Sequence, residues 1–437
     1  MTDSFAMRRR TMLGGAAALG VGLPLLGGAG VAQAATPNGA PSGPAATRRA
    51  VRFLQRVTDA YRSSGPRLAQ SYQDDSGLGD VGFIYDNGLT VIALLAAGDV
   101  RRARAIGDGF LRVQEPDGRL RQAYRVAQDP PVPAANFGFT GTAVGDMAWT
   151  GLALAQLARE TRERRYLDGV VKIGTWIQDN AYSTTGLGGY EFGLTPGLEG
   201  FKSAEHNIDV YALFRLLARL TGDRVWAQRA EHAWDFVERM WNAEAGFFYT
   251  GSNDGATVNT NPLQWPLDVQ TWSWLAARQS RYAAALDWAA NNLATTDTPL
   301  RKNSTLTGND SFTGVAFASG SLLTDTDTPI GGQSYNPKPD DAAVWFEGTA
   351  QLALALRDRG RGDDRADAEE LLDTIRVAQQ RLGQGQTFND RSGEGGIVAA
   401  SSPMDTGFGF GYFPNLHIGA TSWFVMASLN ANPYRFL

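Results

Sequence analysis

Ionisable side chains crowd the start of one apolar helical segment, AEHNIDVYALF at residues 204–214. Glu205 and Asp209 are four residues apart, a spacing that places both on one face of a helix, and His206 follows Glu205 directly. Glu347 is a further carboxylate in an apolar run, DDAAVWFEGTAQLALAL, and we expect it to lie more than a turn inside its helix. Because a buried carboxyl group is costly without a partner or a task, these residues are candidates for chemistry.

The chemistry that paired carboxyl groups can perform is hydrolysis of a glycosidic bond. One protonated carboxyl group donates its proton to the leaving oxygen, while an ionised one activates a water molecule. Burial and a neighbouring carboxylate raise the pKa of one member of such a pair, which separates the two roles. We predict that Glu347 is the acid and that Asp209 is the base.

Polar or acidic residues begin each of six apolar helical segments, and we expect these starts to meet in one pocket. Carboxylates accept hydrogen bonds from sugar hydroxyls there, and tryptophan faces stack on pyranose rings. Asp268 and Asp341 fit the role of helix N-caps better. The predicted substrate-binding residues are Asp86, Asp146, Trp149, Glu205, His206, Trp272, Trp345, His417 and Trp423.

Two kinds of helical segment alternate along the chain and must position these residues. The first kind is apolar nearly all round, which is typical of helices that are buried on every side. It covers residues 85–97, 144–160, 206–220, 268–278, 344–357 and 417–429. The second kind carries charged residues on one face and covers residues 47–63, 100–114, 164–178, 224–240, 281–293 and 364–382. Six inner and six outer helices predict an all-α fold, the (α/α)6 toroid.

The connections between these segments are unequal in length. Those from inner to outer helices are short, as at residues 97–99 and 221–223. Those from each outer helix to the next inner helix are long and cover residues 115–143, 179–205, 241–267, 294–343 and 383–416. The long loops therefore open at the end of the toroid where the inner helices begin, and such loops on a rigid scaffold commonly carry binding sites.

The N-terminal residues predict export from the cell. RRRTML at residues 8–13 precedes a Gly/Ala/Leu stretch that ends in Ala32-Gln33-Ala34, the pattern of a twin-arginine signal peptide over residues 1–34. A Pro/Gly linker follows at residues 35–46, and residues 47–437 form the toroid domain. No later stretch is apolar for 18 residues, so we expect a secreted protein that does not contact the membrane after signal cleavage.

Composition excludes several other functions. The formal net charge is −5 and the chain has no basic stripe, which argues against nucleic acid as a partner. The absence of cysteine excludes disulfides and cysteine-liganded metals, and three histidines are too few for a histidine-rich metal site. We therefore expect no metal and no cofactor, and a monomer that acts on an oligosaccharide or polysaccharide.

The whole pattern resembles the six-hairpin glycosidase superfamily of (α/α)6 enzymes. Five segments carry the resemblance: YDNGLTVIALLAAGD, GDMAWTGLALAQLARE, AEHNIDVYALFRLLARLTGD, WFEGTAQLALAL and PNLHIGATSWFVMASLNANPY. The superfamily contains inverting glucanases, unsaturated glucuronyl hydrolases and sugar epimerases, and a related toroid carries polysaccharide lyases. The resemblance implies a glycoside hydrolase, and its glucuronyl variant would rely on Asp86 and Asp146.

Two other functions remain open at this point. A polysaccharide lyase would neutralise a uronic carboxylate and abstract a proton, for which Lys202, His206, Arg301 and Lys302 are the available residues. An acidic pocket would repel such a polyanion. A non-catalytic glycan-binding protein would keep the tryptophans but would not need Glu347.

Overall fold

The computed structural model describes residues 42–138, 140–195 and 197–437. The predicted signal peptide and residues 35–41 of the predicted linker lie outside these residues. The end of the predicted linker is helical, since α1 begins at Gly43 with a proline in its first turn, a position that suits proline because its missing N–H has no helical partner there.

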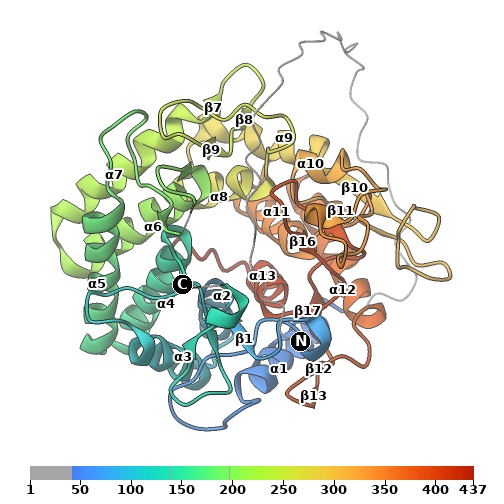
Figure 1. Ribbon diagram of the computed structural model, residues 1–437, viewed down its shortest axis with the longest axis horizontal. Coiled ribbons are helices and arrows are strands. Elements are labelled where there is room, and N and C mark those ends of the chain that lie inside the picture. The colour runs from blue at the N-terminus through green and yellow to red at the C-terminus, as the bar shows by residue number, and fades with distance from the viewer. Residues whose placement is uncertain (1–41, 139, 196) are drawn as a thin grey trace.

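Two concentric rings of helices make up the fold, which Figure 1 shows in a view down the ring. The inner helices are α2 (Ile84–Ala96), α4 (Val144–Thr161), α6 (Ala204–Thr221), α8 (Leu267–Ala277), α11 (Phe346–Arg359) and α13 (Ile418–Ser428). The outer helices are α1 (Gly43–Thr58), α3 (Val100–Val113), α5 (Arg164–Ala181), α7 (Arg224–Arg239), α9 (Ala284–Asn292) and α12 (Asp364–Arg381). Each inner helix packs against the next, and α13 packs against α2, so the ring is closed. The predicted (α/α)6 toroid is confirmed.

The two rings differ in burial as their sequences require. Inner helix α4 is buried on every side from Met147 to Ala158, whereas outer helix α5 buries one face through residues such as Val170, Ile173 and Ile177. Among the described residues, the structure contains no helix with the length and apolarity needed to cross a membrane.

Short antiparallel strands in the long connections fix where each inner helix begins. In six places, the residues just before an inner helix pair with a neighbouring connection. Three are strand pairs: β1 (Val81–Phe83) with β2 (Ala123–Arg125), β4 (Thr142–Ala143) with β5 (Gly193–Leu194), and β6 (Lys202–Ser203) with β9 (Gly251–Ser252). The others are single bridges: Pro266 with Ala318, Trp345 with Ala400, and His417 with Tyr72. This chain of pairings runs around the mouth of the toroid and holds the six helix starts together.

The remaining strands lie within or between these connections. They are β3 (Val132–Pro133), β7 (Trp241–Asn242), β8 (Phe247–Phe248), β10 (Ala294–Asp297), β11 (Phe312–Val315), β12 (Thr387–Phe388), β13 (Arg391–Ser392), β14 (Ile397–Val398), β15 (Met404–Asp405), β16 (Gly411–Tyr412) and β17 (Leu416–His417). A one-turn helix, α10 (Ser319–Leu322), also lies in the connection before α11.

Buried amide side chains in three inner helices bind the preceding connection. Asn87 exchanges hydrogen bonds with the backbone N–H and carbonyl of Ala69. Asn207 does the same with Tyr190, and Gln270 with Phe248. Some of the polar residues at the helix starts are therefore structural, because they satisfy backbone groups that burial would otherwise leave without partners.

The C-terminal segment closes the other end of the ring. Asn432 donates to the carbonyl of Leu275 near the end of α8, and Gln156 in α4 donates to the carbonyl of Arg435. In Figure 1 the C-terminus lies within the ring, beside α2, α4 and α6. The axis is thus covered at the end opposite the long loops.

Candidate functional site

Five of the six inner helices carry an acidic residue in their first turn, and the sixth has a histidine as its N-cap. The acids are Asp86, Asp146, Glu205, Asp268 and Glu347, and the histidine is His417. Because the six helix starts lie at one end of a closed ring, these side chains gather at the mouth of the toroid.

The two acids that the sequence favoured as N-caps do not have that role. The N-cap of α8 is Pro266, and Asp268 lies inside the helix, where its Oδ1 accepts from the N–H of the adjacent Val269 at 2.7 Å. Asp341 lies outside any helix and pairs with Arg301 at 2.7 Å. Asp268 therefore belongs to the group of acids at the mouth.

Glu347 lies nearer the start of its helix than its sequence context indicated. Helix α11 begins at Phe346, so Glu347 is in the first turn. The preceding residues are extended because Trp345 bridges to Ala400 and the N–H of Val344 donates to Ser401. Glu347 is nevertheless only 1% exposed, which makes its carboxyl group as buried as expected.

A hydrogen-bond network holds the Glu347 carboxyl group. The Tyr85 hydroxyl donates to Oε1 at 2.6 Å and accepts from Nε1 of Trp423 at 3.2 Å. Oε2 lies 3.6 Å from Nδ1 of His417 and has no hydrogen-bonding partner among the described residues. Burial raises the pKa of Glu347 to about 7, against the opposing effects of His417 and Tyr85. Near neutral pH this group can therefore release or take up a proton.

His417 joins two of the acids. Its Nε2 lies 3.0 Å from Oδ1 of Asp86, its Nδ1 accepts from the N–H of Ala420, and its ring stacks on Tyr72 with a centroid distance of 4.2 Å. Burial disfavours the cation, but the carboxylates of Asp86 and Glu347 raise the pKa of His417 above its usual value. His417 thus positions the acids, in addition to any contact with a ligand.

The other first-turn acids affect one another. Burial, followed by the charges of Asp268, Asp209, Asp146 and Glu347, raises the pKa of Glu205 well above its usual value. Burial also raises the pKa of Asp146 and of Asp268 to about 7. Glu205 and Asp146 are partly exposed, whereas Asp86 and Asp268 are buried. Glu205 therefore holds its proton more tightly than an ordinary glutamate, and a ligand at the mouth can reach it.

Asp209 lies one turn deeper in α6 and is fully buried. The hydroxyl of Tyr434, from the C-terminal segment, donates to its Oδ1 at 2.9 Å, and Oδ2 has no hydrogen-bonding partner within the described part of the chain. Burial raises the pKa of Asp209 well above its usual value, although the hydrogen bond from Tyr434 opposes this. Asp209 therefore lies beneath the acids of the mouth and holds its proton more tightly than an ordinary aspartate, and its role as base stays a prediction.

Three of the tryptophans expected to stack on a sugar form a floor beneath the acids. Trp149, Trp272 and Trp423 are at most 1% exposed. Trp272 stacks on Trp423 at 6.0 Å, and Trp149 packs edge-on against both. Rings covered in this way leave no face for a ligand, because each lies one turn or more below the mouth and points into the axis.

Trp345 is also buried and has an aromatic neighbour at the mouth. It is 2% exposed and stacks on Tyr412 with a centroid distance of 5.7 Å. Tyr412 is partly exposed, and Phe410 beside it is 45% exposed. Burial and the charges of Glu347 and Asp86 raise the pKa of Tyr412. The segment FGFGYF at residues 408–413 marks this aromatic surface, which sequence reasoning missed.

His206 lies at the mouth, as expected, and is largely enclosed. Its ring packs against Phe192 at 4.3 Å and against Gly145, where even a Cβ atom would come within 2.4 Å of it. Burial lowers the pKa of His206 to about 3, so the ring is neutral. Its Nδ1 has no hydrogen-bonding partner among residues that the structure describes.

A metal site is not evident in the described ranges, where no three His, Asp or Glu side chains are arranged to hold an ion. The chemistry available at the mouth is proton transfer between carboxyl groups. The site thus combines two reachable acids, a buried glutamate with a pKa near neutrality and an exposed aromatic surface.

Comparison with known proteins shows similarity in structure but not in sequence. No protein-family model and no curated protein matches the chain. A glycosidase variant in complex with glucose has a TM-score of 0.58 at 11% identity, over 90% of this chain and 100% of its own. A GH76 α-mannanase from Bacteroides thetaiotaomicron has a TM-score of 0.55 at 13% identity, over 91% and 97%. A novel α-amylase from Clostridium perfringens has a TM-score of 0.54 at 11% identity, over 88% and 98%. The chain therefore has the toroidal fold of these six-hairpin glycosidases.

Proposed function

We propose that the protein is a glycoside hydrolase whose active site is the group of acids at the mouth of the toroid. The observation that carries this proposal is the presence of two glutamates in the first turns of inner helices at the mouth: Glu205 in α6 is partly exposed, and Glu347 in α11 is buried and accepts a hydrogen bond from Tyr85. The charge of Glu347 contributes to the raised pKa of Glu205, as expected for two carboxyl groups that face the same space.

The two glutamates take different roles in this proposal. Glu205, with its raised pKa, donates a proton to the leaving glycosidic oxygen. Glu347, which the sequence predicted to be the acid, is the base in this proposal. It is ionised in the reacting state, where Tyr85 and His417 stabilise its charge, and it accepts a proton from the water that attacks the anomeric carbon. Asp209, the base expected from the sequence, is fully buried one turn deeper in α6 and accepts a hydrogen bond from Tyr434, so in this proposal Glu347 takes the role of base in its place.

Substrate binding involves the remaining residues of the mouth. Asp86, Asp146 and His206 are placed to hold sugar hydroxyls, and Tyr412 with Phe410 offers an exposed aromatic surface for a pyranose ring. The neighbours with this fold include a glycosidase with bound glucose, an α-mannanase and an α-amylase, which supports a neutral oligosaccharide or polysaccharide as the substrate class.

A polysaccharide lyase is less consistent with the site. Nζ of Lys202 donates to Ser183 and to the carbonyl of Thr185. Arg301 pairs with Asp341, and Lys302 with Asp327. Each cation considered for binding a uronic carboxylate therefore has another partner, and the acids at the mouth would repel a polyanion.

Incubation with a panel of glycans tests the proposed function. Purified protein should release new reducing ends from at least one α-glucan, β-glucan or α-mannan, without the ultraviolet absorbance of a new double bond. Absorbance of that kind would identify a lyase. Binding to a glycan with no release of reducing ends would identify a non-catalytic glycan-binding protein.

We further propose that the protein is secreted as a folded monomer by the twin-arginine route, with residues 1–34 as the signal peptide and residues 35–42 as the linker before α1. Replacement of both Arg9 and Arg10 by lysine should trap the precursor in the cytoplasm. Normal secretion of that variant would contradict the twin-arginine route while leaving the proposed enzymatic activity open to its own test.

A further inference from the structure

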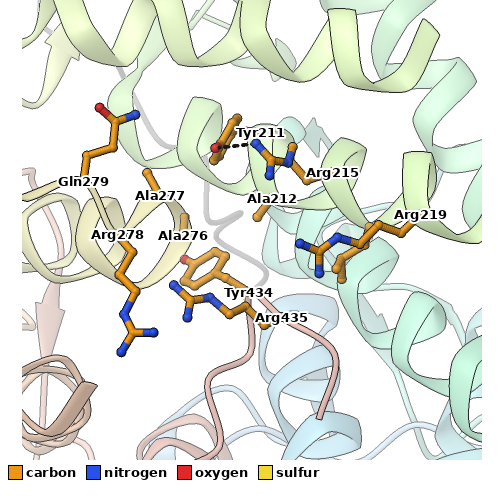
Figure 2. A pocket seen from close by; sticks show the side chains of 11 residues that line it. Tyr211, Ala212, Arg215, Arg219, Ala276, Ala277, Arg278, Gln279, Tyr434 and Arg435 are labelled. Atoms are coloured by element: carbon orange, nitrogen blue, oxygen red, sulfur yellow. Dashed lines mark hydrogen bonds between the residues drawn. The ribbon is translucent and has the colours of Figure 1, made fainter. Parts of the chain in front are cut away.

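A cavity lies at the end of the toroid opposite the acids. It has a volume of about 460 Å³ and is lined by the last turns of α6, the end of α8 and the C-terminal segment. Figure 2 shows the side chains that surround it. Nothing in the proposed hydrolysis uses this cavity, so the inference below does not depend on the proposed function.

The cavity is strongly basic. Its lining residues include Arg215, Arg219, Arg278 and Arg435, and no acidic residue is among them. In Figure 2, Arg215 and Arg219 come from α6, Arg278 from the end of α8, and Arg435 from the C-terminal segment. Residues from three parts of the chain thus place four positive charges around one cavity.

Nearby acids neutralise only part of this charge. Arg215 lies 3.7 Å from Glu231, while Arg278 and Arg435 share Asp358 at 3.2 and 3.9 Å. Arg219 is exposed and has no acidic partner within 4 Å among the described residues. Two acids against four arginines leave an excess of two positive charges.

The arginines also lie close enough to repel one another. Burial lowers the pKa of Arg435, Asp358 opposes this effect, and the charges of Arg278 and Arg219 lower the pKa further. Such repulsion destabilises the free protein unless an anion relieves it.

Interaction with the negative C-terminal ends of helices explains the positions of only some of the four arginines. Arg278 follows the last residue of α8 and donates to the carbonyl of Asp358, a common role for a basic residue at a helix end. Arg219 donates no hydrogen bond of this kind within the described part of the chain. Arg435 belongs to the C-terminal segment and not to either of these helices. These two guanidinium groups have hydrogen-bonding capacity to offer a ligand.

We propose that this cavity binds a small molecule that carries a phosphate group. Guanidinium groups match phosphate oxygens in pairs of parallel hydrogen bonds, and Arg219 and Arg435 can approach such a group from two sides. Ala212, Ala276 and the ring of Tyr434 add a less polar surface for the rest of the ligand. The volume suits a molecule of the size of pyrophosphate or a monosaccharide phosphate.

One lining residue of the cavity also contacts a residue beneath the acids at the mouth. Tyr434 lines the cavity, and its hydroxyl group donates to Asp209 below the acids at the mouth. Tyr434 and Asp209 therefore lie between the cavity and the acids at the mouth.

Isothermal titration calorimetry tests the proposal with pyrophosphate, inorganic phosphate, glucose 6-phosphate and citrate as probes at low salt. We expect at least one phosphate compound to bind, and the affinity to fall as salt rises. Arg219→Gln should weaken binding about tenfold or more, since it removes a charge-assisted hydrogen bond pair. The control Arg164→Gln removes an exposed arginine of α5 that pairs with Asp168, and it should bind like the wild type.

Three results would overturn the proposal. These are no binding of any phosphate compound at millimolar concentration, equal binding by wild type and Arg219→Gln, or citrate binding as tightly as the phosphate compounds. Arg435→Gln gives a second test, provided that its melting temperature equals that of the wild type. Because Arg219 is exposed, the Arg219→Gln result stands even if the Arg435 variant is unstable.

Discussion

The hydroxyl group of Tyr85 donates a 2.6 Å hydrogen bond to Oε1 of Glu347 and so links α2 to α11 on either side of α13. Burial raises the pKa of Glu347 to about 7, and the Tyr85 hydrogen bond is one of the contacts that keeps it from rising further. The charge state of Glu347 at neutral pH therefore depends on Tyr85.

Replacement of Tyr85 by phenylalanine should shift the pH dependence of activity. If Glu347 is the base, activity is lost on the acidic side as Glu347 becomes protonated, and loss of the hydrogen bond raises its pKa. The acidic limb of kcat/KM should therefore move to higher pH, with a loss of roughly tenfold below pH 6 and a smaller loss at high pH.

Tyr166→Phe is the matched control for this variant. Tyr166 is also a tyrosine that donates a hydrogen bond to a carboxylate, that of Asp108 at 2.8 Å, but it is buried on outer helix α5, away from the mouth. Its pH profile should match that of the wild type. An unchanged acidic limb in Tyr85→Phe, or one that moves to lower pH, would show that Glu347 does not act as the base.

Asp268→Asn should stabilise the protein at alkaline pH. In the folded protein Asp268 keeps its proton up to about pH 7, whereas in the unfolded chain it ionises near its ordinary value of about 4. Between these values the folded state binds more protons, so the wild type loses stability as pH rises. Asparagine cannot ionise but keeps the oxygen that accepts from Val269.

The stability difference between this variant and the wild type should be small at pH 4 and grow to the order of 1–4 kcal/mol at pH 8. Urea unfolding at several pH values measures it. Asp168→Asn, which removes an exposed acid on α5, should show no such trend. A constant difference for Asp268→Asn across this range would mean that Asp268 is ionised in the folded protein.

The helices and the gathering of acids were predictable from the sequence because both follow from local patterns. The sequences of the buried inner helices are apolar on every face, which indicates burial. Glu205 in the first turn of α6 is recognisable from the sequence as an acid without a structural role. Asp86, Asp146 and Glu347 recur at equivalent positions of other inner helices, so the symmetry of the toroid brings them together.

The depth of a side chain along the toroid axis, and its contacts with distant parts of the chain, could not be predicted from local patterns. Trp149 and Trp272 are close in sequence to acids of the mouth, but one helical turn places them in the floor. Tyr434 reaches Asp209 from 225 residues away, through the fold of the C-terminal segment. Tyr412 belongs to β16, a two-residue strand within a long connection, which is too short for periodicity to indicate which side chains face the mouth.

Tyr412→Ala should weaken substrate binding without harming the fold. Tyr412 is partly exposed beside Phe410 and lies over the buried Trp345, so its ring is placed to contact a sugar. We expect KM to rise about tenfold, with a smaller change in kcat. Tyr412→Phe keeps the ring and should retain a KM near that of the wild type. Equal KM values for Tyr412→Ala and the wild type would exclude this surface from substrate binding.

The most direct test of the proposed active site compares Glu205→Gln and Glu347→Gln on two kinds of substrate. Both variants keep the shape of the side chain, and both should fold normally and hydrolyse a natural glycan about 10²-fold or more slowly than the wild type. Glu238→Gln, on outer helix α7, is the control and should remain active.

The second substrate is an aryl glycoside of the same sugar with a good leaving group. Such a leaving group needs no proton from the enzyme, so Glu205→Gln should cleave it at a rate close to that of the wild type, whereas Glu347→Gln should remain inactive. Cleavage of the natural glycan by Glu347→Gln and Glu205→Gln at the wild-type rate would contradict the account and place the chemistry elsewhere in the molecule.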